Sequence, residues 1–155
     1  MVIEGNPDAV VIATGGTPAM PDIPGIHKPN VVTAQDVLSG KAKAGQNVVI
    51  IGGGMVGCET GHYLVEQGKT VTIIEILKRM ANDMFFMARR RLIGVLRSKK
   101  VNLLASATCE EIEEGSVQVT TVEGKKETIP ADTIVIAVGY KANDQLYKDL
   151  EGKVS

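Results

Sequence analysis

The sequence contains few of the residues on which several classes of protein depend. It has only two cysteines, Cys58 and Cys109, and therefore predicts no disulfide framework. Aromatic residues make up only 3% of the chain and tryptophan is absent, which disfavours a surface for base stacking. The 17 Lys and Arg residues nearly balance the 18 Asp and Glu residues, so the net charge of -1 lacks the basic excess typical of nucleic-acid-binding proteins.

Long apolar runs and targeting segments are also missing. The longest apolar stretch, residues 48–58, is broken by four glycines and falls short of the about 20 residues that a membrane-spanning helix needs. No signal peptide opens the sequence, so we expect a reducing, cytoplasmic compartment and no membrane partner. The remaining features, 155 residues with a hydrophobic content of 44%, are typical of one folded domain.

The order of the hydrophobic patterns predicts an α/β fold. Short β-branched apolar runs are typical of buried strands, and they occur at residues 9–13, 48–51, 71–75, 101–104 and 133–138. Apolar residues at helical spacing predict one helix over 55–67 and another over 83–100, with Asp83 as its N-cap. The apolar face of the second helix is predicted to hold Phe85, Ala88, Leu92 and Val95 or Leu96.

Two further segments complete the expected fold. Residues 18–30 contain four prolines and predict an irregular linker along the surface, followed by a short helix within 31–39. Residues 108–129 mostly alternate between apolar and polar, with Gly115 and Gly124 at the breaks, which indicates an antiparallel meander. The expected fold is therefore a Rossmann-like parallel sheet with a G-x-G-x-x-G βαβ unit and an inserted antiparallel β-meander.

One glycine motif predicts a nucleotide site. Gly52 allows a tight turn out of the strand, Gly54 lets the backbone approach a diphosphate, and Gly57 lets the helix pack closely on the sheet. The N–H groups at the helix start would face the diphosphate, aided by the helix dipole. We therefore assign to dinucleotide binding Gly52, Gly53, Gly54, Met55, Val56 and Gly57. A glycine-rich turn that merely packs a βα unit is the alternative.

An acidic residue at the end of the next strand extends the motif. Glu75 stands where a carboxylate would hold the two hydroxyls of the adenosine ribose. A carboxylate there repels a 2′-phosphate, so we expect NADH to be preferred over NADPH. Lys78 and Arg79 follow closely and could soften that preference, although solvated surface charges are the simpler interpretation.

Four segments in this order resemble the pyridine-nucleotide-disulfide oxidoreductase superfamily. They are VVIATGGTP at 10–18, GGGMVGCE at 52–59, the acid Glu75 and IAVGY at 136–140. Within the superfamily, residues 48–75 and 129–144 look most like the C-terminal part of NADH:flavin oxidoreductases of the 2,4-dienoyl-CoA reductase type. The superfamily has two dinucleotide-binding domains, of which this chain resembles the one for NAD(H).

The resemblance implies a fragment of a larger flavoprotein. Residues 1–40 would be a remnant of the flavin-domain edge and a proline-rich linker, 41–140 the NAD(H)-binding Rossmann domain, and 141–155 the start of the return to a missing FAD domain. FAD would belong to the full-length protein, together with FMN and an iron–sulfur cluster in the dienoyl-CoA reductase type. Glu59, Val138 and Gly139 would lie near the nicotinamide. For Glu59, an acid near the start of the helix that is favoured only by the helix dipole is an equal alternative.

The remaining chemistry-bearing residues have simpler interpretations. Cys58 and Cys109 lack a partner at redox-motif spacing, so both are interpreted as buried structural thiols. His27 and His62 have no companions at metal-ligand spacing, and we predict no metal site. No side chain is assigned as catalytic.

The leading hypothesis is an NAD(H)-binding module that delivers hydride from NADH to flavin in a full-length oxidoreductase, with the isolated chain inactive. A non-enzymatic NADH-responsive sensor or scaffold is the alternative, and an S-adenosylmethionine methyltransferase fits the late glycine segments poorly. The expected partners are NADH and the flavin domains of the parent protein, with no nucleic acid; a homo-oligomer is left open.

Overall fold

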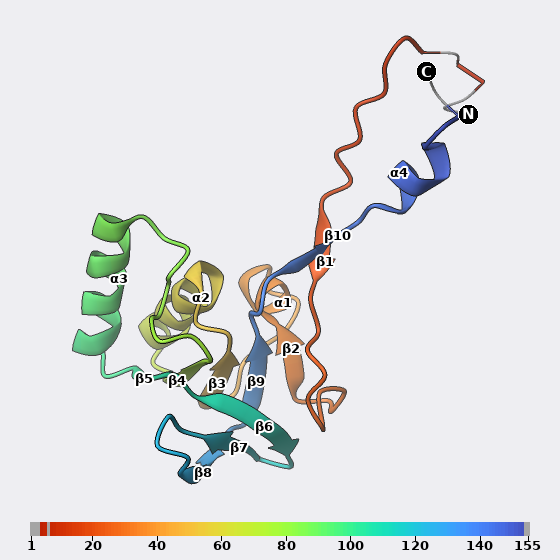
Figure 1. The fold of residues 1–155 in the computed structure, drawn as a ribbon. Helices are drawn as coiled ribbons and strands as arrows, with labels where there is room; N and C mark the ends of the chain where they lie inside the picture. The colour runs from red at the N-terminus through yellow and green to blue at the C-terminus, as the bar shows by residue number, and fades with distance from the viewer. Residues whose placement is uncertain (1–3, 6, 154–155) are drawn as a thin grey trace. The chain divides into compact units, whose positions relative to one another are not determined.

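The computed structural model describes residues 4–5 and 7–153 (Figure 1). Their contacts divide the chain into two compact units, one formed by Ala19–Gly139 and a smaller one formed by the segments on either side. The α/β prediction is confirmed, with a parallel sheet and antiparallel strands present together. The assignment of the flanking segments to a flavin domain stays a prediction.

The larger unit contains most of the regular structure. Its elements are β2 (Val31–Thr33), α1 (Ala34–Leu38), β3 (Asn47–Ile51), α2 (Met55–Glu66), β4 (Thr70–Glu75), α3 (Phe86–Ser98), β5 (Asn102–Ala105), β6 (Thr108–Glu113), β7 (Ser116–Thr120), β8 (Lys126–Pro130) and β9 (Thr133–Ile136). In the smaller unit, β1 (Gly16–Pro18) pairs antiparallel with β10 (Tyr140–Ala142), and α4 (Gln145–Leu150) follows.

The parallel sheet has the strand order β2-β9-β3-β4-β5. The chain runs from β3 outward through β4 to β5, whereas the other neighbour of β3 is the late strand β9. The strand order therefore reverses between β3 and β9. In open parallel sheets, ligands bind beyond the carboxyl ends of the strands at such a reversal.

The two faces of the sheet are covered differently, as Figure 1 shows for the helices and for β6 to β8. Alternate residues of a strand point to opposite faces. Val48 and Ile50 of β3 pack with the helices, whereas Val49 and Ile51 pack with the antiparallel sheet β6-β7-β8. The predicted meander is thus present, and it forms the second layer of the core.

Residues 19–30 of the predicted proline-rich linker contain neither helix nor strand, whereas its first residue, Pro18, is the last residue of β1. Part of the segment enters the core. Ile26 is buried against the meander, and the Ile112 N–H donates to the Pro24 carbonyl oxygen at 2.8 Å. A side chain at Gly25 would overlap the Ile112 carbonyl, so the segment follows β6 closely. The linker is therefore packed more tightly than a segment that merely lies on the surface.

The buried strand predicted for residues 9–13 is wrong. This segment has no regular structure, and the Val11 side chain is 92% exposed. The first strand is instead β1, which begins at Gly16. A β-branched run forms a buried strand only where neighbouring strands cover it, and within the described residues the smaller unit offers just the β1–β10 pair.

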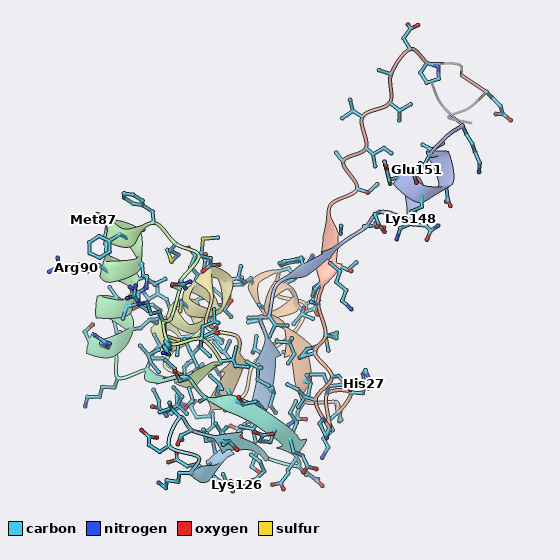
Figure 2. All side chains as sticks on the ribbon, viewed as in Figure 1. His27, Met87, Arg90, Lys126, Lys148 and Glu151 are labelled. Atoms are coloured by element: carbon cyan, nitrogen blue, oxygen red, sulfur yellow. The ribbon has the colours of Figure 1, made fainter. Side chains whose placement is uncertain are left out.

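The start of α3 also differs from the prediction. The helix begins at Phe86, its N-cap position is held by Phe85, and Asp83 does not cap it. Phe85 is 78% exposed, whereas the buried side chains of α3 are Ile93 and Leu96. Figure 2 shows Met87 and Arg90 on the outer side of α3. The predicted apolar face is therefore correct at its C-terminal end only, because residues 76–84 form turns that delay the helix.

This difference can be measured with two alanine variants. Leu96→Ala removes a fully buried side chain and should lower the free energy of unfolding by about 2–5 kcal/mol. Phe85→Ala should change it by less than about 0.5 kcal/mol, because its side chain lies in solvent. Urea denaturation followed by circular dichroism measures both values. Equal losses in the two variants would contradict the observed start of α3.

Candidate functional site

The glycine motif forms the turn from β3 into α2 through close backbone contacts. Gly52 has a φ of +102°, and a Cβ there would lie 2.5 Å from the Ala137 carbonyl oxygen. A Cβ at Gly57 would overlap the carbonyl oxygen of Gly52. These two contacts bring the start of α2 against the carboxyl ends of β3 and β9, which is the packing predicted from the spacing.

The start of α2 presents backbone donors. Gly54 is the N-cap and provides no side-chain hydrogen bond. Within the described part of the chain, no acceptor contacts the N–H groups of Gly54 and Val56. The first N–H groups of a helix have no partner inside the helix and carry partial positive charge, so they favour an anion.

Glu75 lies at the end of β4 with its carboxylate directed at the glycine turn. Its side chain is buried, with 8% exposure. Oε2 accepts the Gly53 N–H at 2.7 Å, and Oε1 accepts the Leu77 N–H at 2.8 Å. Each carboxylate oxygen can accept a second hydrogen bond, so the carboxylate is held in place and still able to receive hydroxyl donors.

A second carboxylate, which the sequence did not assign to this site, belongs to Asp83. Its Oδ1 accepts the Met55 N–H at 2.8 Å, although Asp83 itself is exposed. No spacing rule connects Asp83 to Met55, since the two lie on different segments 28 positions apart. From its short acidic side chain, the sequence predicts that Asp83 caps a helix. It does not indicate that the helix contacted by Asp83 is α2.

A cavity of about 900 Å³ opens beside the glycine turn at the reversal of strand order. Of the predicted residues, those that line it are Gly52, Gly54, Met55, Val56, Glu75, Val138 and Gly139. The other three do not: Gly53 and Gly57 are buried behind the turn, and Glu59 is exposed on α2. The structure therefore brings both predicted ends of the site, the ribose acid and the last glycine segment, to one cavity.

Further lining residues were missed because they follow no recognisable motif. They come from the proline-rich segment, the turn after Glu75 and the start of β6, and include Pro21, Ile23, Leu77 and Thr108. Most are apolar and make an opening suited to a flat, partly apolar ligand. Arg79 also lines the cavity, whereas Lys78 does not.

Both thiols are structural, as the sequence indicated. Cys58 is buried in α2, where its thiol donates to the Gly53 carbonyl oxygen at 3.3 Å, and burial raises its pKa to about 11. Burial likewise raises the pKa of Cys109, which lines the cavity, to about 11. The thiolate form needed for nucleophilic or redox chemistry is therefore suppressed at neutral pH.

Other site types have no support among the described residues. The described residues contain no group of three or more His, Cys, Asp or Glu side chains placed to hold a metal ion. His62 pairs with Glu66 at 3.7 Å on α2, whereas His27 lies in the proline-rich segment (Figure 2). No helix in residues 4–5 and 7–153 is long and apolar enough to cross a membrane.

Comparison with known proteins identifies the family. A profile of the pyridine nucleotide-disulphide oxidoreductases matches residues 4–154. The chain belongs to this family. It is 39% identical over 153 residues to an NADH oxidase of Thermoanaerobacter brockii, covering 96% of the chain and 24% of the relative. It is 35% identical over 182 residues to a metal reductase of Desulforamulus reducens, covering 99% of the chain and 27% of the relative.

Solved structures of reductases share the family fold. A 2-naphthoyl-CoA reductase in complex with 2-naphthoyl-CoA superposes with a TM-score of 0.90 at 35% identity, covering 99% of this chain and 23% of that one. An NAD-dependent persulfide reductase from A. fulgidus gives a TM-score of 0.72 at 34% identity over 93% of this chain and 28% of that one. The chain thus spans about a quarter of the length of these relatives.

The thiol assignment predicts slow alkylation with a definite pH dependence. At pH 7.5 a pKa near 11 leaves roughly a hundredfold less thiolate than the ordinary value of 9.0. Iodoacetamide should therefore label Cys58 and Cys109 slowly in the folded chain and rapidly in urea, as followed by mass spectrometry. Because folding raises these pKa values, the associated stability is complete below about pH 9 and is lost as the pH rises toward 11. Fast labelling of folded Cys58 at pH 7.5 would refute this assignment.

Proposed function

We propose that the chain is the NAD(H)-binding module of an FAD-dependent oxidoreductase, of the NADH:flavin oxidoreductase or dienoyl-CoA reductase type. The carrying observation is the combination at one cavity of the available Gly54 and Val56 N–H groups with the buried Glu75 carboxylate. These donors suit a diphosphate, and the carboxylate suits ribose hydroxyls. The cavity lies where the strand order reverses, the usual position for such ligands in open α/β sheets.

Each part of the site would have a separate task. Glu75 would accept hydrogen bonds from the adenosine ribose, already oriented by its bonds to Gly53 and Leu77. The N–H groups at the start of α2 would donate to the diphosphate. Val138 and Gly139, after the carboxyl end of β9, would border the nicotinamide. Glu59 lies on α2 outside the cavity lining, so its proposed part in orienting the nicotinamide rests on the resemblance to the family alone.

Bound NADH would supply the hydride, and FAD in the full-length protein would accept it. The residues of this chain would bind and orient the dinucleotide, and the redox chemistry would belong to the cofactors. The isolated chain is proposed to be inactive in hydride transfer. An FMN site and an iron–sulfur cluster elsewhere in the parent protein belong to this proposal through the resemblance to the dienoyl-CoA reductase type.

The names of the relatives support the proposal that these proteins share a region that supplies reducing equivalents to different reactions. The same region matches proteins named metal reductase, NADH oxidase and cinnamate reductase, at 35%, 39% and 36% identity. Two of the names give different electron acceptors, a metal and cinnamate, and the third gives NADH as the electron donor, so the matched region would suit a step that these proteins share, such as the binding of NADH. The exposed apolar run at 9–13 is consistent with an edge that a flavin domain would cover.

A calorimetric titration of the purified chain with NADH, NADPH and FAD in parallel tests the proposal. We expect NADH to bind, NADPH to bind more weakly and FAD to bind little. Absence of NADH binding by a chain that circular dichroism shows to be folded would overturn the proposed site. NADH binding without flavin reduction in the full-length protein would favour the sensor or scaffold alternative.

The ribose assignment predicts a change in cofactor discrimination. Glu75→Gln keeps the size of the side chain but removes the charge and one acceptor oxygen, so NADH affinity should fall about tenfold or more. NADPH affinity should fall less, because the repulsion of its 2′-phosphate is removed as well. Glu66→Gln, at the far end of α2, is the matched control. An unchanged ratio of NADH to NADPH affinity in Glu75→Gln would show that Glu75 is not the ribose ligand.

A further inference from the structure

The glycine turn is contacted by two carboxylates that differ in their surroundings. Glu75 is buried and accepts two backbone N–H groups from outside α2. Asp83 is exposed and accepts the Met55 N–H, which belongs to the first residue of α2 itself. Its other oxygen, Oδ2, lies 3.3 Å from the position that a Cβ on Gly54 would take. Asp83 therefore lies over the helix start, at the backbone that the motif reserves for a diphosphate.

The segment before Asp83 is fixed against the same turn. Ala81 is fully buried, and its N–H donates to the Gly53 carbonyl oxygen at 2.6 Å. Ala81 has a φ of +49°, a left-handed conformation that is unfavourable for a side chain and needs support from its surroundings. The Arg89 Nε–H supplies part of that support by donating to the Met80 carbonyl oxygen at 2.6 Å. The position of Asp83 is thus imposed by a packed segment rather than by a loose loop.

The charges at the start of α2 would make the Asp83 carboxylate and a bound diphosphate compete for the same N–H donors. The first turn of a helix carries about half a positive charge, which one carboxylate more than neutralises. Asp83 also contributes to the raised pKa of Cys58, after burial as the main cause. A dinucleotide diphosphate brings further negative charge to the same donors, and Asp83 both repels it and occupies the Met55 N–H.

We propose that Asp83 is an affinity-determining residue of the dinucleotide site. Its carboxylate is an internal anion at the start of α2, and the diphosphate must either displace it or bind beside it. This inference rests on the proposed function. Its effect is to weaken binding of the dinucleotide, so that the oxidised product also leaves more readily. Asp83 acts on the diphosphate and not on the nicotinamide or the ribose, which distinguishes it from Glu75.

The test removes the charge and retains the hydrogen bond. Asp83→Asn keeps an oxygen that can accept the Met55 N–H, so the helix start stays capped. Glu66→Gln is the matched control, since it removes the same charge from the C-terminal end of the same helix. The full chain and both variants are titrated calorimetrically with NADH and with ADP-ribose, at low and at high salt.

The expected result is tighter binding in Asp83→Asn only. Its dissociation constants for NADH and ADP-ribose should both fall by about 3- to 30-fold at low salt, and the gain should shrink at high salt because the repulsion is screened. Glu66→Gln should bind as the unaltered chain does. Equal shifts for the two ligands would place the effect on the ADP-ribose part that they share, and loss of the gain at high salt would assign it to the diphosphate, which is the charged group of that part.

Three results would overturn the inference. Unchanged or weaker binding in Asp83→Asn, with NADH binding intact in the unaltered chain, would show that Asp83 only caps the helix. A shift seen with NADH and not with ADP-ribose would remove the diphosphate as the point of competition. Absence of NADH binding in all three folded chains would overturn the proposed function and, with it, this inference.

Discussion

The organisation of the site depends on the buried carboxylate of Glu75. One side chain joins the end of β4 to the turn after β3, because its two oxygens accept N–H groups from Gly53 and Leu77. A buried carboxylate is stable only when it is well hydrogen-bonded, so the turn and the carboxylate stabilise each other. The segment that carries Asp83 follows β4 and is held against the same turn, because the Ala81 N–H donates to the Gly53 carbonyl oxygen.

The cavity results from the way in which the two faces of the sheet are covered. The helices contact one face and the meander contacts the other, and neither layer closes the carboxyl edge between β3 and β9. Close approach at Gly52 and Gly57 brings the α2 donors to that same edge. A larger side chain at either glycine would push α2 outward and separate the donors from the carboxylate, so the packing of the fold and the geometry of the site have a common cause.

Much of this arrangement could be predicted from local sequence. The strand, glycine turn and helix at 48–67 form a contiguous unit whose spacing is dictated by backbone contacts. The alternation of apolar and polar residues at 108–129 indicates directly that one face of the meander is exposed to solvent. The predictions that failed needed information from distant residues. The apolar pattern at 9–13 predicts a buried strand, but no neighbouring strand covers these residues. The sequence assigns Asp83 to the nearest helix, because a capping residue does not indicate which helix it contacts.

In the proposed site, Asp83 and Glu75 carry the same chemical group and would have opposite effects on ligand binding. Glu75 binds backbone groups outside α2 and leaves acceptor capacity directed at the cavity, so its charge would add to the recognition of hydroxyl donors. Asp83 accepts the N–H of a helix residue that an anionic ligand would also need. The sign of each contribution is therefore set by the partner atom and not by the distance to the ligand. A site whose fingerprint is complete can still have its affinity lowered by one residue outside that fingerprint.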